Sequence, residues 1–130
     1  MNREHLIDIG LARTQTFTVE ETHSAAHLGS GTVSVLSTPS MILFMEITAR
    51  SLLDEHLPDT HTTVGVHLDV RHLAACPIGV QVEARVGVIA VEGRKVQPSV
   101  EVWQGDKQLG DGQHARVIVD KARFLEKSNS

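Results

Sequence analysis

Glu46 stands in surroundings that demand a chemical explanation. It follows five consecutive apolar residues, 41–45, and precedes Ile47. Removing an ionised carboxylate from water is costly unless another group pairs with it. The placement therefore indicates a carboxylate used in acid–base or nucleophilic chemistry, an ion pair with Arg50 on the next helical turn, or a helix rotated so that Glu46 reaches solvent.

His72 and Thr38 are two further candidates for the same chemistry. His72 continues the apolar alternation of residues 64–70, which predicts that it faces the helix, where it can hydrogen-bond the Glu46 carboxylate or serve as a structural core histidine. Thr38 precedes Pro39 and is predicted to cap the helix that follows. The free N–H groups at that helix start would also stabilise negative charge on an attacked carbonyl oxygen.

One helix must carry Glu46. Apolar residues recur at three- and four-residue spacing after Thr38, and the pattern stops near residues 56–58, where Pro58 forbids continuation. The apolar run over residues 41–45 covers nearly every face of the first turns, so the sequence predicts a helix surrounded by protein.

The rest of the chain alternates with the period of a strand. Strands are predicted over residues 11–19 before the helix and 64–72, 80–88, 95–103 and 108–119 after it, while residues 20–37 read as an irregular connection. Short turns at 92–94 and 105–106 predict antiparallel pairing. The chain is therefore predicted to be an α+β hotdog fold, an antiparallel sheet wrapped around one central helix, with a cystatin-like sheet as the alternative.

Composition narrows the classes of partner. The chain has 130 residues, of which 41% are hydrophobic and 22% charged, and it lacks a linker, so we expect one domain over residues 1–130 with a frayed tail at about 126–130. A net charge of −4 without a basic stripe argues against nucleic acid. We expect a cytoplasmic protein that does not enter a membrane. The chain has a single cysteine, Cys76, its start at residues 1–5 does not resemble a signal peptide, and it lacks a long apolar run.

Two other histidine patterns carry weaker signals. His114 and Arg116 share one face of the last predicted strand with two glycines, which favours a solvated face for both residues. His23 and His27 have helical metal-ligand spacing, but their segment is weakly helical and matches no ligand pattern, so no metal site is predicted.

Together these motifs resemble the hotdog-fold thioesterases of the fluoroacetyl-CoA thioesterase family. The resemblance runs from about residue 6 to residue 120 and rests on residues 38–46, 65, 72–79 and 114–116. It implies that Thr38, Glu46 and His72 match the catalytic threonine, glutamate and histidine of that family. It also implies that Gly65 and Arg116 match positions that contact the acyl group.

The resemblance implies an acyl-CoA thioesterase that hydrolyses a short-chain acyl-CoA to the free acid and coenzyme A. It implies a homodimer with sites near the subunit interface and no cofactor beyond the coenzyme A of the substrate. In the expected mechanism, backbone donors polarise the thioester carbonyl. Glu46 attacks it or activates water, His72 handles protons and Thr38 orients the carboxylate.

The segment before the helix departs from the fluoroacetyl-selective pattern. Selective members close the site with phenylalanines there, whereas residues 28–37 contain none. Selectivity for fluoroacetyl is therefore not implied, and a larger or more polar acyl group could fit. A non-catalytic acyl-CoA-binding hotdog module and a hotdog hydratase remain open as alternative functions.

Overall fold

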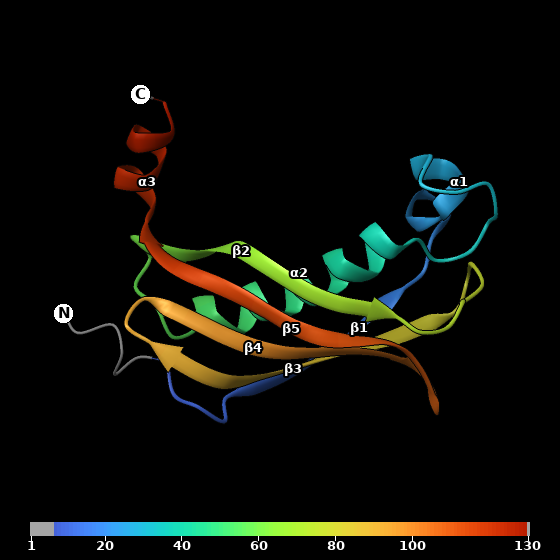
Figure 1. Cartoon of the computed structure of the whole chain (residues 1–130), viewed down its shortest axis with the longest axis horizontal. Coiled ribbons are helices and arrows are strands. Elements are labelled where there is room, and N and C mark those ends of the chain that lie inside the picture. The colour runs from blue at the N-terminus through green and yellow to red at the C-terminus, as the bar shows by residue number, and fades with distance from the viewer. Residues whose placement is uncertain (1–6, 130) are drawn as a thin grey trace.

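One long helix lies along a five-stranded antiparallel sheet in the computed structural model, which describes residues 7–129 (Figure 1). The strands are β1 (Ala12–Thr18), β2 (His61–His72), β3 (Gln81–Glu92), β4 (Lys95–Gln104) and β5 (Lys107–Asp120). They lie in the order β1-β3-β4-β5-β2, so β1 and β2 form the two edges. This is the predicted α+β arrangement, with all neighbouring strands antiparallel as expected.

The helix α2 (Thr38–Asp54) packs one side onto the sheet, and most of the core lies between the helix and the sheet. Its Phe44 ring stacks on Phe17 of β1 at a centroid distance of 4.4 Å, and His23 meets the same ring edge-on at 4.9 Å. Such pairs add to the energy of burying the rings. The prediction that protein surrounds the helix on all sides is wrong within one chain, because Leu43 is 45% exposed.

The first turn of α2 corrects the predicted cap. Ser37, in extended conformation, is the N-cap, and its hydroxyl accepts a hydrogen bond from the Ser40 N–H at 3.1 Å. Thr38 is instead the first helical residue. Two hydroxyl residues precede Pro39, and either can accept from an early N–H, so the sequence alone does not distinguish them. The Thr38 hydroxyl is consequently available to another partner.

The predicted alternation along β2 is wrong in its first half. A β-bulge between Gly65 and His67 inserts one residue and reverses which side chains face α2. Before the bulge, Thr63 is buried and a Cβ on the exposed Gly65 would point toward His114 and Glu46, whereas His72 faces α2 after it. Val66, predicted to face the helix, is 56% exposed.

Short helices replace two segments that were predicted to be irregular. The 3-10 turn η2 (Glu21–His23) and the helix α1 (Ala25–Leu28) precede α2, and α3 (Lys121–Ser128) follows β5 and projects from the opposite end of the sheet (Figure 1). The expected tail is therefore wrong for residues 126–128. Asp120 caps the start of α3 by accepting a hydrogen bond from the Arg123 N–H. The helix has only eight residues, too few for an apolar period to be recognised in the sequence.

The described residues contain no helix that is long and apolar enough to cross a membrane. The expectation drawn from the start of the chain, residues 1–5, lies outside the described residues.

Gly112 offers a test of the pairing between β2 and β5. A Cβ at this position would lie 2.2 Å from the Asp69 carbonyl oxygen, and φ is +156°. We expect Gly112→Ala to lower the free energy of unfolding by about 2 kcal/mol or more, because backbone must move to admit the methyl group. Gly87→Ala in β3 is the control, since its nearest neighbour would be 3.7 Å away. Equal urea-unfolding curves for the two variants would contradict this account.

Candidate active site

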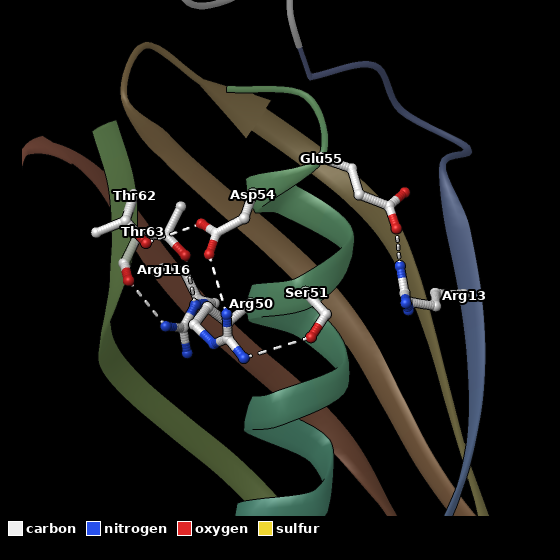
Figure 2. A network of polar contacts seen from close by, with 8 residues as sticks. All are labelled: Arg13, Arg50, Ser51, Asp54, Glu55, Thr62, Thr63 and Arg116. Carbon is white, nitrogen blue, oxygen red and sulfur yellow. Dashed lines mark hydrogen bonds and ion pairs between the residues drawn. The ribbon is translucent and has the colours of Figure 1, made fainter. Parts of the chain in front are cut away.

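Glu46 lies on the side of α2 that the sheet does not cover. Its side chain is 39% exposed and shares this stripe with the exposed Leu43 and Arg50. Arg50 binds Asp54 at 3.1 Å, and Asp54 also accepts from the Thr62 hydroxyl at 2.8 Å (Figure 2). The interpretation of Glu46 as the ion-pair partner of Arg50 is therefore wrong, and its carboxylate is left to other groups.

Arg116 of β5 is the cation nearest to that carboxylate. It is only 5% exposed, and its Nε and Nη2 donate to the hydroxyl and the carbonyl oxygen of Thr63 at 2.8 and 2.9 Å (Figure 2). Its Nη1 lies 3.7 Å from Glu46 Oε2. Burial lowers the pKa of Arg116, while Glu46 and Asp54 act in the opposite direction. The predicted solvated face is wrong, because this face of β5 is interior.

His114, two residues earlier on the same face, is 1% exposed. Its Nε2 lies 4.0 Å from Glu46 Oε2. Burial, followed by the neighbouring charge of Arg116, lowers the pKa of His114 to about 4, so the ring is neutral near pH 7. The sequence analysis placed His114 on a solvated face and gave it no role in the site, although the face that it shares with Arg116 was the signal that could have placed both residues together.

Gly65 completes this cluster by having no side chain. A Cβ there would lie 2.9 Å from His114 Nε2, 3.2 Å from Glu46 Oε2 and 3.5 Å from Arg116 Nη1. An added Cβ would force His114 Nε2 to shift and press on Glu46 Oε2, while it would make an ordinary contact with Arg116. The glycine therefore keeps open the small space on which the carboxylate, the guanidinium and the imidazole converge.

Thr38 and His72 form a second polar pair at the start of α2. The Thr38 hydroxyl and His72 Nδ1 are 2.7 Å apart, and His72 Nε2 is buried with no hydrogen-bond partner among the described residues. Burial lowers the pKa of His72, and a backbone hydrogen bond with Ala74 acts in the opposite direction. The imidazole is thus held beside the first free N–H groups of the helix.

The three residues expected to form a triad occupy two places in one chain. No hydrogen bond or ion pair between described residues joins Glu46 to Thr38 or His72. Thr38 and Glu46 are eight positions apart on α2, which corresponds to about 12 Å along a helix axis. Thr38 therefore orients His72 rather than the carboxylate within a single chain.

Among residues 7–129, no group of three or more His, Cys, Asp or Glu residues could hold a metal ion. His23 accepts a hydrogen bond from the Glu20 N–H at 2.9 Å and packs on Phe44. Those contacts give His23 a structural role at the start of α1.

Comparison with known proteins identifies relatives of this arrangement. The sequence matches the family model described as fluoroacetyl-CoA-specific thioesterase over residues 19–122. It is similar to the fluoroacetyl-CoA thioesterase of Streptantibioticus cattleyicolor, with 28% identity over 93 residues that make up 72% of this chain and 67% of that protein.

Solved structures agree with the sequence match. An alanine variant of the fluoroacetyl-CoA-specific thioesterase in complex with fluoroacetate and CoA has a TM-score of 0.86 and 25% identity, covering 91% of this chain and 99% of that chain. A hot-dog-like protein from Thermanaerovibrio acidaminovorans has a TM-score of 0.89 and 25% identity, covering 98% and 95%. The predicted hotdog fold is confirmed.

The depressed pKa of His114 predicts how stability depends on pH. The unfolded chain binds a proton near pH 6.5, whereas the folded ring does so only near pH 4. The free energy of unfolding is therefore unaffected by this histidine above pH 6.5. It falls as the pH drops from 6.5 toward 4, by at most about 3 kcal/mol, because only the unfolded chain binds the proton in that range. Urea unfolding at pH 7 and pH 4.5 should show a smaller loss for His114→Gln, which cannot ionise. An unchanged loss in that variant would contradict the assignment.

Proposed function

Because this chain belongs to the family of fluoroacetyl-CoA-specific thioesterases, we propose that it is an acyl-CoA thioesterase that hydrolyses a short-chain acyl-CoA to the free acid and coenzyme A. The observation that carries the proposal is the Glu46 carboxylate. It lies on an accessible stripe of α2 with one oxygen directed toward Arg116 and His114. The other oxygen is left for substrate or water.

Glu46 is the group that starts the reaction. It takes a proton from the water that attacks the thioester carbonyl, or it attacks the carbonyl itself and water then cleaves the anhydride. Either route forms a C–O bond, breaks the C–S bond and requires the ionised carboxylate. The Arg116 guanidinium lies 3.7 Å from Glu46 Oε2 and carries the opposite charge.

Thr38 and His72 act at the other end of the reacting bond. The neutral imidazole, whose Nδ1 accepts from the Thr38 hydroxyl, presents Nε2–H as a hydrogen-bond donor to the departing thiolate, and the proton that completes the thiol comes from the attacking water. The N–H groups of the first turn of α2 polarise the carbonyl oxygen. Gly65 and Arg116 line the space that receives the acyl group.

We propose that the acyl group is not restricted to fluoroacetyl. Residues 28–37 contain no aromatic ring, and the exposed apolar residues of this segment are Leu28 and Val33. A segment with these small and aliphatic side chains encloses a substituent less tightly than stacked rings do. A larger or more polar short acyl group is the expected substrate.

The proposed active unit is a homodimer formed along β2. This strand is a 12-residue sheet edge, and Val66 and Leu68 are exposed on it. The exposed Leu43 of α2 adds to the apolar surface beside Glu46. An unprotected apolar edge is a site for pairing with another chain. A two-fold pairing would run the partner's α2 antiparallel to this one and carry the partner's helix start toward Glu46.

Acyl-CoA hydrolysis by variants tests the proposed roles. We expect Glu46→Gln and His72→Ala to lower kcat by about 100-fold or more, because each removes a group that handles the attacking or leaving atom. Arg85→Gln, on the exposed surface of β3, is the control. A panel of acyl-CoA and enoyl-CoA substrates should be read for free thiol and for loss of the enoyl chromophore. Binding without thiol release would indicate a binding module, and chromophore loss alone a hydratase.

Mixed dimers test whether two chains share each site. A heterodimer of one Glu46→Ala and one His72→Ala subunit retains one complete site if the carboxylate and the imidazole come from different subunits, and none if they come from the same subunit. We expect the purified heterodimer to release thiol while both mutant homodimers do not. An inactive heterodimer of the correct mass would contradict the shared site.

A further inference from the structure

His114 is a buried histidine without a hydrogen-bond partner. Its side chain is fully enclosed, and neither Nδ1 nor Nε2 bonds to another described residue. Buried polar groups in native proteins are nearly always paired, so an unpaired one marks a role or an absent partner. A leucine of similar size would fill this position without leaving polar atoms unsatisfied.

The surroundings of Nε2 indicate what its partner is. Glu46 Oε2 lies 4.0 Å away, and Arg116 Nη1, which is also buried and unpaired, lies 3.7 Å from the same oxygen. Gly65 leaves the space between these atoms open. A carboxylate only accepts hydrogen bonds, so Nε2 interacts favourably with it when Nε2 carries the proton.

We propose that His114 is a positioning residue for Glu46, donating from Nε2 to one carboxylate oxygen so that the other oxygen is held toward the acyl carbonyl. The inference rests on the proposed thioesterase function, in which Glu46 reacts. The Glu46 side chain is partly exposed and needs to move by about 1 Å to bring Oε2 within hydrogen-bond distance of Nε2. Catalytic hydrogen bonds often tighten in this way when substrate binds.

A neutral imidazole suits this task better than a second cation. Arg116 already places one positive charge 3.7 Å from Glu46 Oε2. A second positive charge in contact with a carboxylate stabilises its ionised form and so weakens it as a base or nucleophile. The low pKa of His114, about 4, keeps the ring neutral. It therefore adds direction to the interaction without adding charge.

Two substitutions separate positioning from packing. In His114→Gln the amide nitrogen takes the place of Nε2, whereas in His114→Asn the shorter amide lies near the place of Nδ1 and cannot reach Glu46. We expect His114→Asn to lower kcat by about 10- to 100-fold with little change in KM. His114→Gln should retain most of the wild-type kcat. Equal kcat values in both variants, whether high or low, would overturn the proposal.

A measurement that does not depend on turnover accompanies the kinetics. In ¹⁵N NMR of wild-type protein with labelled histidine, we expect the Nε2–H tautomer of the His114 ring, and a shift of the Nε2 resonance in Glu46→Ala. The Nδ1–H tautomer, or a resonance unaffected by Glu46→Ala, would overturn the proposal even if His114→Asn failed to fold. If no acyl-CoA releases thiol but the NMR results are as expected, the proposed function fails and the contact between His114 and Glu46 stands.

Discussion

A buried guanidinium must find partners, and the partners of Arg116 set the geometry of the site. Two of its nitrogens bind the hydroxyl and carbonyl of Thr63, which fixes β2 beside β5 at the point where Gly65 pairs with Arg116. The third nitrogen is then directed toward Glu46. Because a buried charged group that loses its hydrogen-bond partners is costly, the two bonds to Thr63 hold the sheet edge, and the guanidinium that they fix lies beside Glu46 on α2.

The bulge in β2 links this constraint to the second polar pair. It allows Gly65 to face Glu46 and His114 on one side of Val66 and His72 to face α2 on the other. A regular strand keeps one parity and would turn one of the two outward. One extra residue therefore lets a single edge strand serve both the carboxylate cluster and the start of α2.

Periodicity sufficed to predict the elements, because core packing requires apolar residues at the helical or strand spacing. The order of one strand, one helix and four antiparallel strands is confirmed, and α2 begins one residue before the predicted start at Pro39. Three features depend on longer-range geometry that spacing does not encode. The bulge reversed the facing of residues 64–66, Ser37 rather than Thr38 caps the helix, and His114 lies in the interior because α2 covers that face of β5.

The exposed stripe of α2 connects stability with activity. An apolar Leu43 beside a reactive carboxylate is a poor surface for an isolated chain, because it leaves apolar area in water and a carboxylate open to bulk solvent. A second copy packed along β2 would remove both defects, burying Leu43 and Val66 while bringing an imidazole toward Glu46. In the proposed homodimer, the distance along α2 between Glu46 and the Thr38–His72 pair at the helix start would give the two chains a reason to associate, since the partner could bring its pair to the carbonyl that faces Glu46.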